Sequence, residues 1–187
     1  MNIFLYLLFL NAIQPDTAAA SVSLQIARAA LEQVGVTTGY SPGYEKMGYP
    51  GGDLPPDRGV CTDVVVRAFR KAGIDLQKEI HLDMAGHFSE YPRLWNLKTT
   101  DTNIDHRRVP NQMKFLQRRG KSRAIGSEYR PGDVVAWRLP NGMHHIGIVS
   151  NEPVPGEKRY FMIHNIGEGA KSEDVLFVYR IIGHYRW

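Results

Sequence analysis

Apolar residues recur at helical spacing through the first half of the chain, which is the pattern of amphipathic helices. The predicted helices are Ser21–Val34, Thr62–Ala72, Gln77–Glu90 and Asn111–Arg119. Gly35 and Gly73 directly follow two of these segments, and glycine is common just after a helix end. Asn111 has a side chain suited to an N-cap. Two segments, Gly39–Gly59 and Lys98–Pro110, have no such period and are expected to be loops.

The second half of the chain changes to short apolar runs rich in β-branched and aromatic residues. These runs predict strands over Asp133–Arg138, His145–Ser150, Tyr160–His164 and Val175–Ile182. Helices that precede a run of strands favour an α+β fold, with N-terminal helices packed on a C-terminal antiparallel sheet. No repeat or linker interrupts the pattern, so residues 21–187 are predicted to form a single domain.

The first twenty residues have their own pattern. An apolar run over Ile3–Ile13 is followed by Pro15 and then by the small residues Ala18–Ala20. These are the parts of a secretory signal peptide cleaved near Ala20, although no basic residue precedes Arg28. The alternative is a buried N-terminal helix. A signal peptide predicts a periplasmic or secreted protein, and no cysteine near the cleavage site is available for a lipid anchor.

Composition narrows the classes of protein. The chain has 187 residues, of which 43% are hydrophobic and 22% charged, which excludes a disordered chain and a multi-span membrane protein. The net charge of +4 is well below that of a dense nucleic-acid-binding surface, so no nucleic-acid partner is predicted. One cysteine excludes an internal disulfide and a cysteine-based zinc cluster.

Cys61 lies where a glycine-containing loop meets a predicted helix. The first turn of a helix has unpaired N–H groups and a partial positive charge, and both lower the pKa of a thiol. Asp63 opposes this effect unless its side chain points away. The position predicts a nucleophile, whereas the alternative is a small buried apolar residue.

A cysteine nucleophile needs a base, and the base needs a partner that orients it. His145 begins one predicted strand and His164 ends the next, so a hairpin can place the two rings together. His145 is then the predicted base and His164 the predicted orienting residue, with Asn165 as the alternative. A zinc site formed by His144, His145 and His164 is a further alternative, although the chain has no H-E-x-x-H motif.

Several segments together resemble the NlpC-like cell-wall peptidases, a superfamily of papain type. The similar segments are Tyr49–Gly52, Cys61–Val65, Arg130–Val135, His145–Val149 and Ile163–Asn165. The resemblance implies a papain-like fold and a thiol enzyme that needs no metal or cofactor. It also implies that the Tyr49 hydroxyl assists the Cys61 N–H in holding the oxyanion.

A closer resemblance is to the exported bacterial domain-of-unknown-function family 1287, through Asp57–Asp63, Asn103–Pro110 and His164–Gly167. Together the resemblances imply an amidase or endopeptidase acting on peptidoglycan stem peptides or another peptide substrate. An acyltransferase, an antibacterial toxin with the same thiol chemistry and a non-catalytic wall-binding module are the alternatives.

Other residues have two interpretations each. In the loop Asp105, His106, Arg107 and Arg108, the arginines either bind substrate carboxylates or form ion pairs in a solvated loop. His184 has no partner apparent in the sequence. Trp95, Trp137 and the aromatic residues of the last predicted strand are expected in the core.

Overall fold

The computed structural model describes residues 17–187. The predicted signal peptide over residues 1–20 therefore lies outside the described residues, apart from residues 17–20, which begin the first helix. Within the described part of the chain, no helix is both long and apolar enough to cross a membrane.

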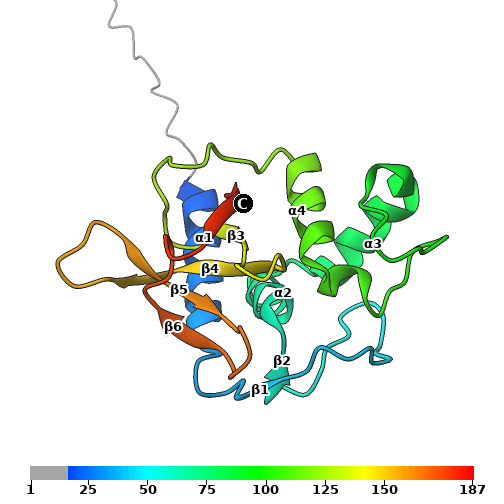
Figure 1. Ribbon diagram of the computed structural model, residues 1–187, viewed down its shortest axis with the longest axis horizontal. Helices are drawn as coiled ribbons and strands as arrows, with labels where there is room; N and C mark the ends of the chain where they lie inside the picture. The colour runs from blue at the N-terminus through cyan, green and yellow to red at the C-terminus, as the bar shows by residue number, and fades with distance from the viewer. Residues whose placement is uncertain (1–16) are drawn as a thin grey trace, which may run out of the picture.

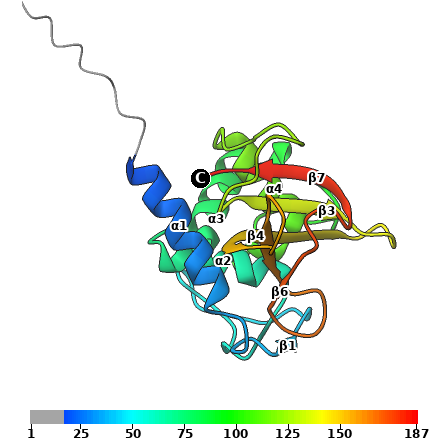
Figure 2. The ribbon, with the colours of Figure 1, turned by 90° about the vertical axis from the view of Figure 1, so that its left-hand side faces the viewer.

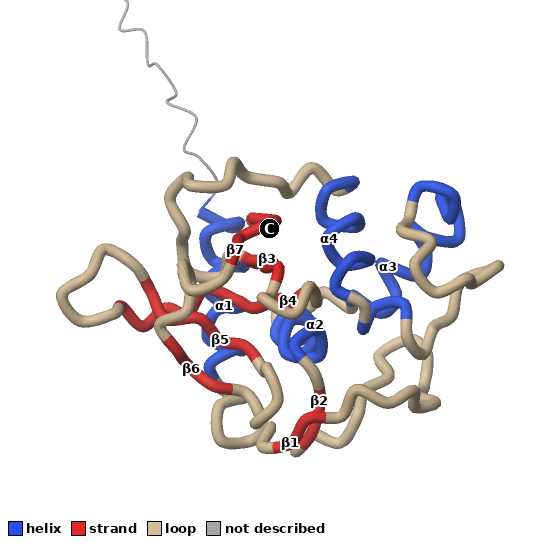
Figure 3. The backbone as a smooth tube through the Cα atoms, in the orientation of Figure 1, coloured by secondary structure: helices blue, strands red, loops and turns tan. Residues whose placement is uncertain are grey.

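A five-stranded antiparallel sheet forms the C-terminal half, with the strand order β6-β5-β4-β3-β7 (Figures 1 and 3). Its strands are β3 (Val134–Arg138), β4 (His144–Pro153), β5 (Tyr160–His164), β6 (Lys171–Glu173) and β7 (Arg180–Tyr185). Consecutive strands β3 to β6 are neighbours, so short hairpins connect them, and β7 returns to pair with β3.

The helices of the N-terminal half are α1 (Thr17–Leu31), α2 (Cys61–Lys71), α3 (Leu76–His87) and α4 (Val109–Arg118). Two 3₁₀ turns, Phe88–Glu90 and Asp105–Arg107, follow α3 and precede α4. The short strands β1 (Gly39–Tyr40) and β2 (Arg58–Gly59) pair in parallel just before α2. Figure 2 shows α1 and α2 together on one side of the sheet, and both contact β4. The predicted α+β class, with helices packed on an antiparallel sheet, is confirmed.

Alternate residues of the sheet face two separate apolar clusters, as the pleat of a strand requires. One face packs Ile146 and Ile148 against the apolar residues of α1 and α2. The other face buries Trp137 and Val149 with Met162. The face with Trp137 also carries the histidines described below.

The predicted strand over Val175–Ile182 is confirmed only for Arg180–Ile182, the start of β7, and is wrong before that. Leu176–Val178 form a turn, and β7 begins only at Arg180. The turn leaves Phe177 64% exposed, so this aromatic residue is not in the core. Its position has a physical reason: the Leu176 carbonyl accepts a hydrogen bond at 3.0 Å from the indole N–H of buried Trp137. The turn that begins at Leu176 places its carbonyl within reach of the Trp137 indole.

Two smaller expectations also differ from the structure. Asn111 is not the N-cap of α4, because the helix begins at Val109 and Arg108 holds the cap position. The Asn111 amide is instead buried and donates to the Asp105 carbonyl at 3.0 Å. Trp95 is 37% exposed rather than in the core, and the Arg108 guanidinium lies 4.0 Å from the centre of its ring.

Candidate active site

The hairpin of β4 and β5 places two histidine rings together. Ile148 lies opposite Ile163, so Gly147 lies opposite His164, and His145 is two residues farther along the same face of β4. His145 Nε2 lies 2.9 Å from His164 Nδ1, and the two residues are only 3% and 1% exposed. Gly147 provides the space, because a Cβ there would lie 3.0 Å from the Cβ of His164.

Burial favours the neutral form of both rings. The indole of Trp137 stacks on His145 with ring centres 5.7 Å apart. Burial lowers the pKa of His145 to about 3, and the neighbouring His164 ring acts in the same direction. Burial also lowers the pKa of His164, against the opposite effect of Glu173, whose Oε2 lies 3.0 Å from His164 Nε2.

The thiol of Cys61, the first residue of α2, lies beside β4. Amides at alternate positions of a strand point to the same side. The Val149 amide donates at 2.8 Å to the Asp133 carbonyl on the β3 side, so the Ile146 amide points to the other side of β4. There β5 has already ended, and the Ile146 amide hydrogen-bonds the Cys61 thiol. This amide belongs to the peptide unit that joins His145 to Ile146.

The pKa of the Cys61 thiol is raised to about 12, chiefly because the side chain is buried. Asp63 raises this pKa further, whereas the N–H groups of Ile146, Thr62 and Cys61 lower it. The prediction of a lowered thiol pKa is therefore wrong, because desolvation outweighs the helix N-terminus. In this structure the thiol and His145 are both neutral, so they do not form an ion pair at rest.

Asp63 and Arg107 form a buried ion pair at the start of α2. Asp63 Oδ2 accepts the Val60 N–H at 2.7 Å, and its two oxygens accept from Arg107 Nε and Nη2 at 2.9 and 3.0 Å. Arg107 is only 6% exposed and also donates to the carbonyls of Ser41 and Gly43. Arg107 is therefore neither in a solvated loop nor free to bind a substrate carboxylate.

Arg107 belongs to the 3₁₀ turn Asp105–Arg107, and other groups of this turn also contact the start of α2. The Thr62 hydroxyl donates to the Arg107 carbonyl at 2.9 Å, and the Gln112 amide donates to the carbonyls of Thr62 and His106. His106 is buried, which lowers its pKa to about 4. Asp105 is also buried, and burial raises its pKa. The Asp105–Arg107 turn thus fixes the residue that follows Cys61.

Tyr40, rather than Tyr49, is the tyrosine whose strand position is near the start of α2, because it pairs with Gly59, two residues before Cys61. The ring of Tyr49 instead packs edge-on against His81 of α3, with ring centres 5.0 Å apart. Burial raises the pKa of Tyr40, and Cys61 and Asp63 raise it further. Tyr40 lies opposite Gly59 in the β1–β2 pair, and no sequence pattern distinguishes it from the other tyrosines of that loop.

Asn165 has a different set of contacts from His164. Its buried amide donates to the carbonyls of Gly39 and Gly59 at 3.2 and 3.1 Å. It therefore joins the end of β5 to β1 and β2, and the side chain that contacts His145 is His164.

The residues of the alternative zinc site do not converge. His144 and His145 are consecutive in β4, so their side chains point to opposite faces. Among residues 17–187, no three histidine, cysteine, aspartate or glutamate side chains are grouped so as to hold a metal ion.

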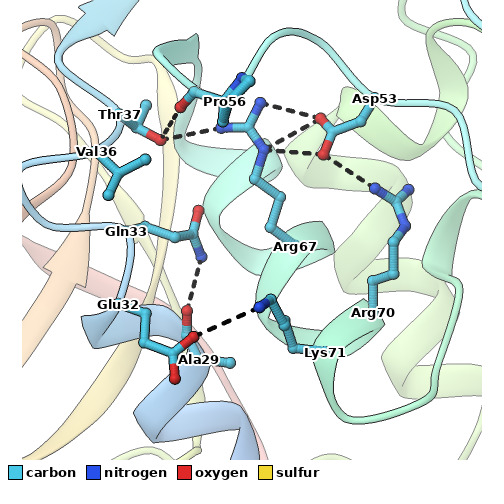
Figure 4. A pocket seen from close by; sticks show the side chains of 10 residues that line it. All are labelled: Ala29, Glu32, Gln33, Val36, Thr37, Asp53, Pro56, Arg67, Arg70 and Lys71. Atoms are coloured by element: carbon cyan, nitrogen blue, oxygen red, sulfur yellow. Dashed lines mark hydrogen bonds and ion pairs between the residues drawn. The ribbon is translucent and has the colours of Figure 1, made fainter.

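A cavity of about 440 Å³ lies at the far end of α2 from Cys61 (Figure 4). Arg67 and Arg70 of α2 line it, and both donate to Asp53. Figure 4 also shows Arg67 reaching the Thr37 hydroxyl, at 3.1 Å. These contacts hold the loop before β2 onto α2. Cys61 is not among the residues that line the cavity, so the cavity is separate from the thiol.

Comparison with known proteins gives three similarities. A family model described as "Domain of unknown function (DUF1287)" matches residues 27–187. "Uncharacterized protein YijF" of Escherichia coli (strain K12) is 51% identical over 171 residues, which cover 90% of this chain and 83% of that protein. The solved structure of NlpC1 from Trichomonas vaginalis is similar with a TM-score of 0.47 and 15% identity. That similarity covers 93% of this chain and less than half, 46%, of the NlpC1 chain.

Proposed function

The chain belongs to the DUF1287 family, and from its site we propose that it is an exported thiol amidase or endopeptidase. The proposed substrates are amide bonds of peptidoglycan stem peptides. The observation that carries the proposal is the pairing of His145 with His164 at 2.9 Å, together with the hydrogen bond to the Cys61 thiol from the amide of Ile146, the residue after His145. A thiol, a base and a group that orients the base are the parts that nucleophilic amide cleavage requires.

The proposed reaction starts from a neutral thiol. His145 takes the Cys61 proton as the sulfur attacks the amide carbonyl, so the thiolate forms only during the attack. The C–N bond then breaks while His145 returns the proton to the leaving amine, and an acyl thioester remains on Cys61. Water hydrolyses the thioester, with His145 taking one proton from the water and returning it to the sulfur.

Two donors are proposed for the oxyanion. The Cys61 N–H, at the start of α2, is one. The Tyr40 hydroxyl is the second, because Tyr40 pairs with Gly59, two residues before Cys61, and Cys61 raises the pKa of Tyr40. This proposal differs from the sequence-based expectation of Tyr49, whose ring contacts His81.

The substrate class and the export rest on sequence. The resemblance of the thiol and histidine segments to NlpC-like cell-wall peptidases supports stem peptides as substrates. The apolar run and small residues within 1–20 support delivery to the compartment that holds peptidoglycan.

The test is digestion of purified peptidoglycan by the purified protein, with Cys61→Ala and Cys61→Ser as controls and fragments identified by mass spectrometry. We expect new stem-peptide fragments from the wild-type protein and none from either variant. The same fragments from all three proteins would contradict a role for Cys61 in cleavage, and no new fragments from any of them would contradict the proposal and would favour a wall-binding protein. A transferred acyl group in place of a hydrolysed one would instead identify an acyltransferase.

A further inference from the structure

Strand β6 brings a carboxylate to the outer nitrogen of His164. Glu173 lies opposite Met162, and His164 is two residues from Met162 on the same face of β5. Residues on this diagonal lie within reach of long side chains. Glu173 Oε2 lies 3.0 Å from His164 Nε2, and the side chain is 41% exposed.

This contact fixes which ring nitrogens carry protons. Glu173 Oε2 and His164 Nε2 lie within ion-pair distance, although Nε2 has no partner in hydrogen-bond geometry. A carboxylate this close repels a bare lone pair on the ring nitrogen, so it favours the tautomer of His164 with the proton on Nε2. His164 Nδ1 is then bare and accepts from His145 Nε2, 2.9 Å away. His145 must therefore carry its proton on Nε2, which leaves its Nδ1 bare.

We propose that Glu173 is a positioning residue that holds His145 in the tautomer with a bare Nδ1, the nitrogen that takes the thiol proton. This inference rests on the proposed thiol chemistry for its effect on rate, but the tautomers can be measured without a substrate. The arrangement extends the site to four side chains, and the last of them reaches the protein surface.

Other charged groups near His164 do not provide the same contact. Lys171 lies directly opposite His164, but its ammonium forms an ion pair with Glu168. A cation beside the ring lowers the pKa of His164, whereas Glu173 raises it. His145 is the remaining titratable neighbour, and it is neutral. Glu173 is therefore the carboxylate that determines the tautomer.

The first test is ¹⁵N NMR of the histidine rings in the full-length protein, in wild type and in Glu173→Ala, with His145→Gln and His164→Gln used for assignment. In the wild-type protein we expect both rings as Nε2–H tautomers with bare Nδ1 atoms. In Glu173→Ala we expect His164 to populate its Nδ1–H tautomer, and His145 to change with it. Unchanged tautomers in Glu173→Ala would overturn the inference, whatever the activity.

Asp174→Asn is the matched control, because it removes the neighbouring carboxylate, which pairs with Arg159 and not with a histidine. We expect this variant to keep the wild-type ring spectrum. An equal change in both variants would overturn the inference in favour of a general charge effect.

The second test is kcat/KM on the stem peptide identified by digestion. A correctly oriented base contributes about 10²- to 10⁴-fold. Because Glu173 acts only by orienting the base His145, we expect Glu173→Ala to lower kcat about tenfold with little change in KM. We also expect Glu173→Asp to recover part of this loss, because it restores the charge. A wild-type protein that cleaves nothing would contradict the proposed function, while the NMR result would still decide the role of Glu173.

Discussion

Two buried histidine clusters lie on the same face of the sheet and differ in what surrounds each carboxylate. In one, His145 and His164 form a chain that ends at the half-exposed Glu173. In the other, His184 Nε2 lies 2.7 Å from Oδ2 of fully buried Asp133, which also accepts two bonds from Arg186 at 2.7 Å. Burial raises the pKa of Asp133, but the bonds from His184 and Arg186 hold it below its usual range.

The second cluster even includes a serine. Ser127 Oγ lies 3.3 Å from His184 Nδ1, so the three residues have the connectivity of a Ser-His-Asp triad. The Ser127 hydroxyl, however, donates to the Ala124 carbonyl at 2.7 Å, and Arg186 neutralises Asp133. The two clusters therefore differ in their contacts: Arg186 holds Asp133 of the second cluster in an ion pair, whereas His145 of the first precedes Ile146, whose amide hydrogen-bonds the Cys61 thiol.

The largest expected difference between the clusters is in catalysis. His145→Gln should lower kcat/KM on stem peptides about 10³-fold, because the variant lacks the general base. His184→Gln should lower the melting temperature but leave kcat/KM of the folded fraction within about twofold of wild type. Steady-state assays and calorimetry check both, and an equal loss of kcat/KM in the two variants would contradict the distinction.

The next difference is in stability. Asp133→Asn should lower the free energy of unfolding by about 3 kcal/mol, because it leaves Arg186 and His184 without their buried partner. Glu173→Gln should cost less than about 1 kcal/mol, since its carboxylate is partly exposed. Urea unfolding measures both, and a larger cost for Glu173→Gln would contradict the assignment.

The sequence predicts those strands and helices whose form depends on the pattern of their own residues. Residues Tyr160–His164 match β5 as predicted, because an apolar run ends there at a polar loop. Strand β6 could not be predicted, since Lys171–Glu173 is polar and takes its strand form from pairing with β5. Glu173 was missed for the same reason.

The site was predictable in its residue types but not in its electrostatics. Consecutive strands were enough to expect His145 and His164 together. The raised pKa of Cys61 depends on burial by segments distant in sequence, which a helix-start position does not reveal. The partner of Arg107 is 44 residues away in the chain, so its ion pair with Asp63 was equally hidden.

Acid should destabilise the protein through its buried neutral histidines. The pKa values of His145 and His106 are lowered from 6.5 to about 3 and about 4, so between pH 6.5 and 4 the unfolded chain binds more protons than the folded one. Stability therefore falls as pH decreases through this window, by up to about 3 kcal/mol for His106. His106→Gln should flatten the dependence of unfolding free energy on pH.

Exposed His87 provides the control for the acid experiment, because it lies on the surface at the end of α3. His87→Gln should keep the wild-type slope between pH 6.5 and 4. A slope that is the same in wild type and in His106→Gln would show that His106 does not contribute to the acid response.

The smallest expected effect is at the serine of the second cluster. Ser127→Ala should change kcat/KM by less than about twofold and the free energy of unfolding by less than about 1 kcal/mol, because it removes an exposed hydrogen bond to the Ala124 carbonyl and a long contact with His184. Parallel activity and unfolding assays check this. A large loss of activity would mean that the Ser127–His184–Asp133 cluster takes part in the reaction.

The most direct test of the central claim is to trap the acyl thioester on Cys61. The protein is mixed with stem peptides, quenched in acid within the first turnover, digested with pepsin and analysed by mass spectrometry. We predict that the peptide containing Cys61 gains the mass of the substrate's acyl part, and that His145→Gln shows at least about tenfold less of this adduct. Cleavage of the substrate with no adduct on Cys61 would contradict the account.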